Sequence, residues 1–228
     1  MKDNKNLQLS LFRGVKDTQP WPVTLDELVA MMRSDQSVRD LTEKHRYALS
    51  VGDKQSARRY KDMMLSFGIA AHFEGGRRYE HITAFTGLSL VDIDHIAPED
   101  MERVLTLVHA DEHTLLAYVT MSGHGLRILF RYEASPNPSQ GGELGSAMSE
   151  SPLLGRGKGE AAFYRQVFLH GNEYYSNLLG IDYDAQCKNT NRISTIAYDE
   201  NLYYNPDAVP FTVTIEEKKP VGRPRKRV

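Results

Sequence analysis

The sequence predicts an α+β fold built on a ferredoxin-like sheet with the element order β-α-β-β-α-β. The prediction rests on β-rich runs that alternate with helical patterns between residues 87 and 198, and on a separate helical segment before them. Such an order is typical of an antiparallel sheet with two helices on one face. The 228 residues, of which 40% are hydrophobic and 25% charged, suit one domain with short appendages.

The segment before the sheet is expected to form an N-terminal helical accessory layer. Residues 1–20 are polar and mixed, which predicts a loose or strand-like arm. Thr24 and Glu27 are spaced as a capping box, in which each side chain satisfies a free amide at the start of a helix. Residues 37–48 and 56–67 have the pattern of two further helices.

The sheet begins with residues 87–96, a β-rich run, and the proline that follows at position 98 suits the first position of a helix. Many Pro, Gly and Ser residues predict a long mobile insertion over residues 133–158. The other predicted elements are strands over residues 115–121, 126–132 and 192–198, and a helix over about 159–179 that Gly171 and Asn172 could interrupt.

We therefore divide the chain into an arm (1–20), a domain (21–212, with its core at about 85–200) and a basic tail (213–228). The net charge of −2 argues against a surface that is basic all over, but it permits a local basic cleft. A single cysteine fits a reducing compartment. Without a signal-peptide pattern or a long apolar stretch, the sequence predicts a cytoplasmic protein with no membrane partner.

Two aspartates, Asp92 and Asp94, end the first predicted strand. Because they are two positions apart, both side chains project from the same face and repel each other unless a cation lies between them. Their hard oxygen ligands suit Mg²⁺ or Mn²⁺. The apolar residues around them favour a buried strand that delivers both acids to its end, and the alternative is an acidic strand end in solvent.

The turn between the next two strands has the sequence Ser122-Gly-His-Gly-Leu-Arg127. Gly123 and Gly125 let the backbone approach an anion closely, and the Arg127 guanidinium suits phosphate. The same segment could be a hairpin that needs glycine only for its turn. His124 could be a metal ligand, a phosphate donor or a turn residue.

Later polar residues could complete a site. Asp182, which directly follows an apolar residue, is preferred over Asp184 as a third acid, although both could be loop acids. Arg192 could contact a phosphate or pair with Asp182 or Asp199.

Two basic runs precede the sheet, at residues 58–61 and 77–78. Such runs could be solvated faces. Alternatively they could line a template or nucleotide groove, with Tyr60 or Tyr79 available for base stacking.

Three segments carry a resemblance to the VirE amino-terminal domain family, which is related to the archaeo-eukaryotic primase-polymerase superfamily: GLSLVDIDHI, SGHGLRILF and GIDYDAQCKNTNRISTIAYDENLYYNPDA. The resemblance covers roughly residues 40–210. It implies an RRM-like catalytic sheet that binds a nucleoside triphosphate and a single-stranded DNA template, with a helicase as a further partner. By this resemblance Asp92, Asp94 and Asp182 are catalytic ligands of two divalent metals, and the phosphate-binding residues are Ser122, Gly123, His124, Gly125, Arg127 and Arg192.

One position departs from the superfamily pattern. Active relatives usually carry a histidine where this chain has Arg127. Arginine still grips phosphate, but its high pKa prevents proton transfer. With Arg127 at this position, the resemblance still implies nucleotide binding, but the proton transfer that a histidine would perform is lost.

The basic tail contains Gly222-Arg223-Pro224 followed by Arg225, Lys226 and Arg227. This pattern resembles an AT-hook, which lies in the narrow minor groove of A·T-rich DNA. The alternative is a basic linker to a further domain.

These features together predict a metal-dependent nucleotidyltransferase of the primase-polymerase type that acts on nucleic acid in the replication of a mobile element. A catalytically silent nucleotide- or nucleic-acid-binding module on the same fold is the first alternative. A metal-dependent nuclease that uses the same acids is the second.

Overall fold

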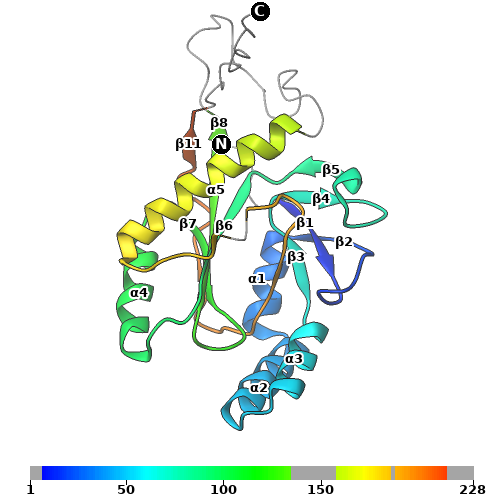
Figure 1. The fold of residues 1–228 in the computed structure, drawn as a ribbon, viewed down its shortest axis with the longest axis vertical. Helices are drawn as coiled ribbons and strands as arrows, with labels where there is room; N and C mark the ends of the chain where they lie inside the picture. Colours follow the sequence, from blue (N-terminus) through cyan, green and yellow to red (C-terminus); the bar gives the residue numbers. More distant parts are fainter. Residues whose placement is uncertain (1–6, 135–157, 186–187, 215–228) are drawn as a thin grey trace, which may run out of the picture.

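The computed structural model describes residues 7–134, 158–185 and 188–214. Figure 1 shows its helices and strands, arranged around one central sheet. The helices are α1 (Leu25–Ser34), α2 (Gln36–Ser50), α3 (Lys54–Met63), α4 (Pro98–Ala110) and α5 (Lys158–Leu179), with a short 3-10 helix η2 (Tyr79–His81). The strands are β1 (Gln8–Phe12), β2 (Trp21–Thr24), β3 (Ser66–Gly68), β4 (Ala71–Phe73), β5 (Ile82–Phe85), β6 (Leu88–Ile93), β7 (Thr114–Val119), β8 (Leu126–Ala134), β9 (Ile193–Thr195), β10 (Tyr203–Tyr204) and β11 (Phe211–Val213).

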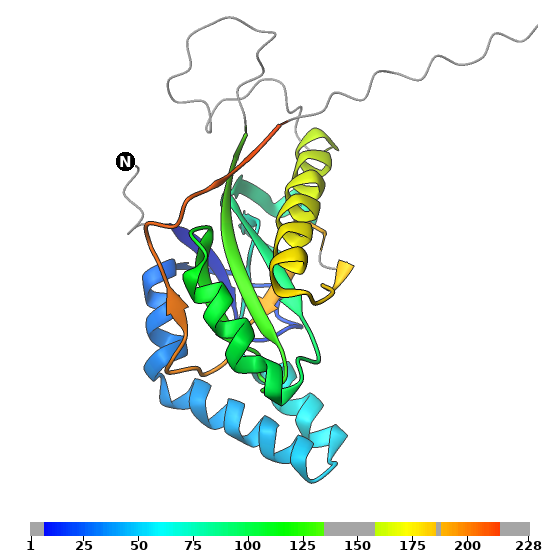
Figure 2. The ribbon, with the colours of Figure 1, turned by 90° about the vertical axis from the view of Figure 1, so that its left-hand side faces the viewer.

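The central sheet, which consists of β6, β7, β8, β10 and β11, confirms the predicted α+β class. Strand β8 pairs antiparallel with β6 on one side and with β7 on the other, and this is the order that a ferredoxin-like unit gives its first three strands. Helices α4 and α5 pack on the same face of this sheet (Figure 2). Buried Val91 of β6 and Phe130 of β8 lie in one cluster with Val104 of α4 and Val167 of α5. Burial of this apolar face holds the helices on the sheet.

The fourth strand of the predicted unit is not part of this sheet. The segment predicted as a strand over residues 192–198 forms the shorter β9, which pairs antiparallel with β3 of a separate sheet ordered β2-β1-β3-β9. The carbonyl of Thr195 accepts hydrogen bonds from Arg127 and Tyr118, whose side chains rise from the central sheet. These contacts hold β9 across the face of the sheet and away from its edge.

The N-terminal layer covers the face of the sheet opposite α4 and α5. One buried cluster joins Leu28 of α1 and Phe67 of β3 to Leu90, Leu116 and other residues of the central sheet. The predicted accessory layer is therefore present, but it also contains strands. Residues 66 and 67, predicted as the end of a helix, belong to β3, which pairs with β1 and β9.

Local signals in the sequence set several helix ends. The capping box predicted at α1 is present, with the Glu27 amide donating to the Thr24 hydroxyl and the Glu27 carboxylate accepting from the Thr24 amide. Pro98 opens α4. Helix α5 continues through Gly171 and Asn172, and the Asn172 side-chain amide donates to the carbonyls of Phe168 and Leu90.

Two predictions concern segments that are largely outside the described residues. Of the insertion predicted for 133–158, residues 133 and 134 belong to β8 and residue 158 begins α5, and the rest lies outside the described residues. The tail predicted for 213–228 is described only as far as residue 214.

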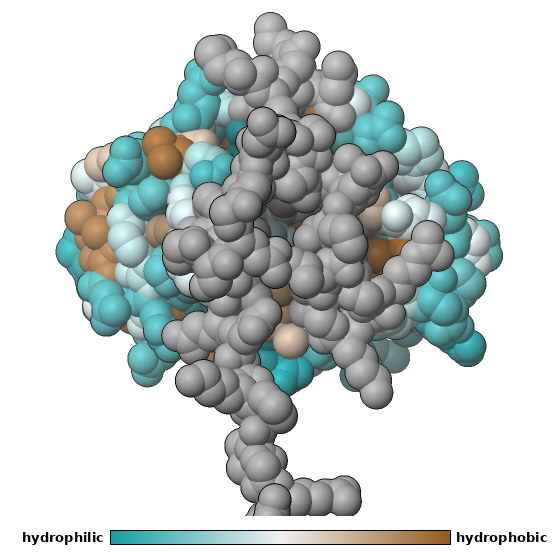
Figure 3. All heavy atoms as spheres, turned by 90° about the horizontal axis from the view of Figure 1, so that it is seen from above, coloured by the Kyte–Doolittle hydropathy of each residue, from teal (hydrophilic) through white to brown (hydrophobic). Residues whose placement is uncertain are grey.

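Within the described parts of the chain, no helix has the length and apolar character needed to cross a membrane. Among the described residues that are visible in Figure 3, hydrophobic and hydrophilic residues are interspersed.

Candidate functional site

A buried ion pair lies on the face of the central sheet that meets the N-terminal layer. The antiparallel register places Asp92 of β6 directly opposite Arg127 of β8. The Arg127 Nε donates to Asp92 Oδ1 and its Nη2 donates to Asp92 Oδ2, both over 3.2 Å. Only 6% of the Asp92 side chain and 14% of the Arg127 side chain are exposed. This two-pronged geometry is the strong form of an arginine–carboxylate contact.

The remaining donors of Arg127 connect the sheet to β9. Its Nη1 donates to the Thr195 carbonyl over 2.7 Å. Burial alone would lower the pKa of Arg127, but the nearby Tyr118 and Asp92 outweigh this effect and raise it above its usual value. The guanidinium is therefore a permanent positive charge with fixed partners.

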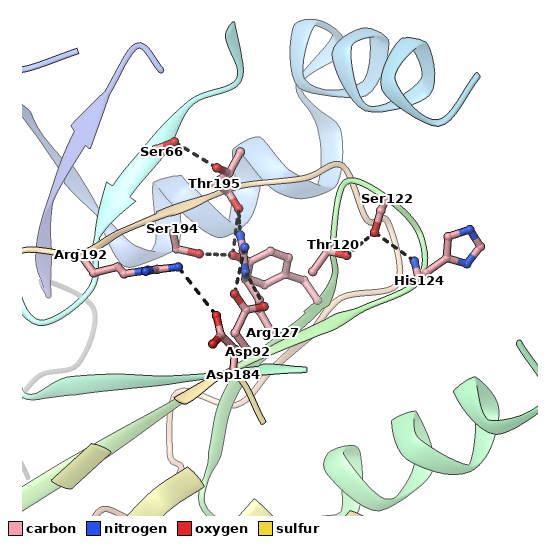
Figure 4. Close-up of polar contacts among 11 residues, drawn as sticks. Ser66, Asp92, Thr120, Ser122, His124, Arg127, Asp184, Arg192, Ser194 and Thr195 are labelled. Carbon is pink, nitrogen blue, oxygen red and sulfur yellow. Dashed lines mark hydrogen bonds and ion pairs between the residues drawn. The ribbon is translucent and has the colours of Figure 1, made fainter. Parts of the chain in front are cut away.

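Tyr118 completes the contact between the layers. Its hydroxyl donates to the Thr195 carbonyl over 3.2 Å and lies 3.1 Å from the Ser194 hydroxyl. Burial raises the pKa of Tyr118, so this phenol stays protonated. Figure 4 shows Arg127 between Asp92 and Thr195, with Ser194 alongside.

Asp184 lies next to Asp92, although the sequence favoured Asp182 over Asp184 as the third acid of the site. Its backbone amide donates to the Asp92 carbonyl over 2.9 Å. Its carboxylate faces Arg192, with an N–O distance of 4.0 Å (Figure 4). Asp182, the preferred third acid, is exposed. Arg192 therefore pairs with Asp184, whereas the sequence suggested Asp182 or Asp199 as its acidic partner.

Asp94 lies beyond the end of β6, exposed and beside the glycine turn. A Cβ placed on Gly125 would come within 2.7 Å of the Ile93 carbonyl oxygen and within 3.4 Å of Asp94 Oδ1. Glycine is thus required at position 125, because the turn packs closely against the end of β6. This requirement is one of chain packing and does not by itself imply a ligand.

The turn itself is held by internal hydrogen bonds. Gly123 adopts a left-handed conformation with φ of +79°, and its amide donates to the Thr120 carbonyl. The Ser122 hydroxyl lies 3.0 Å from that of Thr120 and accepts from the His124 amide. His124 is exposed and points away from the Asp92–Arg127 pair (Figure 4).

Arg46 of α2 reaches the same turn from the N-terminal layer. It donates to the carbonyls of Met121 and Thr120, each over 3.2 Å, and burial lowers its pKa. It borders a pocket of about 560 Å³ that is also lined by Ser122, Gly123, His124, Asp199 and Glu200, among other residues. The pocket has two acids close to its basic groups, which weakens it as a phosphate site.

The arrangement does not fit the two-metal site implied by the resemblance. Both oxygens of Asp92 are engaged by Arg127, which supplies the compensating positive charge that a metal would otherwise provide. Among the residues that the structure describes, no three or more His, Cys, Asp or Glu side chains form a group that could hold a metal ion. For Asp92 to bind a metal, Arg127 would have to leave it.

The two upstream basic runs have different surroundings. Residues 58–61 lie on α3, whose only buried residue is Ala57, so this helix presents a solvated basic face. Arg77 and Arg78 instead line a second pocket with Tyr79. The tail residues Arg223, Arg225, Lys226 and Arg227 lie outside the described part of the chain.

Three participants were missed from the sequence, namely Tyr118, Thr195 and Arg46. Tyr118 and Thr195 lie in ordinary strand patterns, and nothing in their spacing predicts a contact 77 positions apart in the chain. A basic residue in the middle of an amphipathic helix was the one available signal for Arg46, and it is a weak signal.

The fold and the site define an α+β domain in which a central sheet and an N-terminal layer enclose a buried aspartate–arginine pair. A family model described as BT4734-like, N-terminal domain, matches residues 59–204. The chain belongs to this family, and the matched range includes Asp92, Arg127, Asp184 and Arg192. No curated protein and no solved structure shows a significant match to the chain.

Proposed function

We propose that this domain is a nucleic-acid-binding module on a primase-polymerase-like fold, in which the Arg127 guanidinium replaces a catalytic metal. The observation that carries the proposal is the buried pair of Asp92 and Arg127, joined by two hydrogen bonds of 3.2 Å. A carboxylate that is already neutralised by arginine has little remaining affinity for a divalent cation. The first of the three expected metal ligands thus has a structural role.

Several features support nucleic acid as the ligand. The resemblance to the VirE amino-terminal and primase-polymerase families points to this class, although a fold does not fix a function. Arg192 is 41% exposed beside the central pair, and Arg77 and Arg78 line a pocket on the same molecule. The basic tail, with its AT-hook-like pattern, supplies additional positive charge.

The charge distribution is consistent with local recognition of phosphate. With a net charge of −2, the chain as a whole does not attract a polyanion. Binding would therefore depend on places where positive groups gather away from carboxylates. It would weaken steeply as the salt concentration rises, because each phosphate contact releases a counterion.

The test compares binding and synthesis in the same preparation. We expect a labelled single-stranded DNA oligonucleotide to bind equally in Mg²⁺, in Mn²⁺ and after removal of divalent metal with EDTA. We expect no labelled nucleotide to be incorporated on a single-stranded template with either metal. Binding that disappears with EDTA would contradict the proposal.

A metal-dependent nucleotidyltransferase acting in the replication of a mobile element is the second candidate. It is favoured by the exposed position of Asp94 beside the glycine turn and by the position of Asp184 next to Asp92. Mg²⁺ or Mn²⁺ with a nucleoside triphosphate would then be required, and Arg127 would have to move. Product formed by the wild type, and lost in Asp94→Asn, would select this candidate, whereas cleavage of the template would indicate a nuclease.

A further inference from the structure

We propose that the pocket beside the β4–β5 loop is the site that holds single-stranded nucleic acid, with arginines on the phosphates and Tyr79 against a base. The inference rests on the proposed function and names the surface that would carry it out. The pocket is separate from the buried Asp92–Arg127 pair and from the glycine turn.

The chemistry of the pocket favours an anion. It measures about 480 Å³ and is lined by Thr18, Gly75, Gly76, Arg77, Arg78, Tyr79, His81 and Asn191. Among these described residues there are two arginines and a histidine but no carboxylate. This contrasts with the larger pocket at the glycine turn, which contains Asp199 and Glu200. A volume of this size suits one nucleotide unit.

The loop that forms the pocket has a fixed backbone. Gly75 has a φ of +68°, a left-handed conformation that side chains disfavour. A Cβ on Gly76 would lie 2.5 Å from two ring atoms of His81, so the imidazole packs directly on the glycine backbone. The Glu74 amide donates to the His81 carbonyl, and the His81 amide donates to the Arg78 carbonyl. A preformed loop loses little conformational entropy when it binds a ligand.

The two arginines have complementary positions. Arg77 is anchored, because its Nη1 donates to the Val15 carbonyl over 2.7 Å. Since a carbonyl is neutral, this hydrogen bond does not compensate the charge of Arg77. Arg78 is 83% exposed and contacts the Glu80 carboxylate at 3.6 Å. Exposed ion pairs of this length are weak. A phosphate could therefore replace Glu80 as the partner of Arg78 at little cost.

Tyr79 and the neighbouring chain favour a strand over an isolated phosphate. The Tyr79 residue is 38% exposed at the pocket, and an aromatic ring beside cationic groups is the usual platform for an unpaired base. Asn191 lines the pocket, and the next residue, Arg192, faces Asp184 at 4.0 Å. A strand bound here would extend along Arg192 towards the central pair. Because the site is concave and fits one nucleotide, it suits a single strand and does not suit a duplex.

The test measures fluorescence anisotropy of a labelled oligo-dT of about 12 nucleotides. The background is the full-length chain with Arg223, Arg225, Lys226 and Arg227 changed to Gln, so that the tail does not mask the pocket. The variants are Arg78→Gln and Tyr79→Ala. Arg39→Gln is the control, because Arg39 is also an arginine paired with a nearby glutamate, Glu43, but its side chain is 47% exposed and it lies on α2 outside the pocket.

We expect Arg78→Gln to weaken binding by about 3- to 10-fold and to reduce the slope of log affinity against log salt by about 0.7. Tyr79→Ala should weaken binding by about 5-fold or more without changing that slope. Arg39→Gln should match the background. Circular dichroism melts that coincide with the background will show that the variants are folded.

Two results would overturn the inference while leaving the proposed function intact. One is equal binding by the background, Arg78→Gln and Tyr79→Ala. The other is displacement of the oligonucleotide by free nucleoside triphosphate at comparable phosphate concentration, because the ligand would then be the nucleotide. Absence of binding by the wild-type chain is a different result, since it would overturn the proposed function itself.

Discussion

At the scale of single residues, the central observation is that Asp92, the first aspartate of a pattern typical of metal ligands, forms an internal ion pair. Asp92 and Arg127 are nearly inaccessible to solvent and satisfy each other with two hydrogen bonds. A buried pair of this kind is costly to break, because the remaining charge has no partner. It contributes less than its strong geometry suggests, because both groups lose their hydration when they are buried.

The first prediction concerns the loss of one partner. Asp92→Asn leaves the Arg127 charge buried without compensation, and we expect it to lower the free energy of unfolding by about 3–5 kcal/mol. Urea denaturation followed by circular dichroism measures the change. Lys16→Gln is the control, since it removes the exposed Lys16–Asp62 pair, and it should have little effect.

The second variant tests the pair as a unit. Asp92→Leu/Arg127→Met replaces both charges by apolar groups of similar volume, and we expect most of the lost stability to return. If the double variant is as unstable as Asp92→Asn, removal of the unpaired charge does not offset the loss of the hydrogen bond that Arg127 donates to the Thr195 carbonyl.

The residue scale also shows where sequence information ends. The candidate acids and the glycine turn could be identified, because residue type and local spacing are visible in the sequence. The pairing of Asp92 with Arg127 could not, because it depends on the register of β6 against β8, two strands separated by a helix and another strand. The choice of Asp184 over Asp182 depended in turn on the course of a loop with no periodic pattern.

At the scale of elements, α5 shows how one small residue fits a helix to a sheet. A Cβ on Gly171 would lie 2.1 Å from Cζ of Phe130. The helix passes so close to this ring that only glycine fits. The sequence predicted that Gly171 and Asn172 could interrupt the helix. Glycine is a poor helix former, but tertiary packing decides the conformation at this position.

This contact gives the third prediction. Alanine normally stabilises a helix relative to glycine by about 1 kcal/mol. At position 171 we expect the opposite, a loss of about 1–3 kcal/mol, because Phe130 must move from its place in the core. Urea denaturation of Gly171→Ala measures this, and Asn177→Ala on the exposed side of the same helix should cause no loss.

The hairpin of α2 and α3 gives a prediction of pH dependence. His45 is buried, and its Nδ1 donates to the Ala57 carbonyl over 2.8 Å. Burial lowers the pKa of His45, and the charges of Lys61 and Arg46 add to this effect. The folded state therefore prefers the neutral ring. Its contribution is complete above the unfolded pKa, near 6.5, and is lost as the pH falls below that value.

We expect the urea midpoint of the wild type to fall between about pH 7.5 and pH 5.5, and the fall to be smaller in His45→Gln. His72 and His109 have pKa values lowered in the same direction, so the variant should retain part of the dependence. An unchanged slope in His45→Gln would show that this histidine does not couple to folding.

At the scale of the whole molecule, the two layers share one apolar core. Leu9 of β1 and Met32 of α1 belong to the same buried cluster as Leu88 of β6 and Leu129 of β8. The Arg127 and Tyr118 contacts to Thr195 reinforce this junction. The sequence predicted both layers, but the position of β9 between them could not be predicted, because it depends on contacts far apart in the chain.

The shared core predicts cooperative unfolding. The chain has one tryptophan, Trp21, which lies on β2 in the N-terminal layer. We expect its fluorescence and the far-ultraviolet circular dichroism to report the same urea midpoint, as for a two-state domain. Two separate midpoints would show that the layers unfold independently.

The displacement of β9 from the central sheet has a consequence for association between molecules. Among the described strands, none pairs with β6 on the side where a ferredoxin-like unit has its fourth strand, and an open strand edge can recruit another chain. Here the Leu90 carbonyl accepts from the Asn172 side chain and the Asp92 carbonyl accepts from the Asp184 amide. Two carbonyls of this edge are thus occupied by a helix side chain and a loop amide, and they are not available to pair with a strand of another molecule.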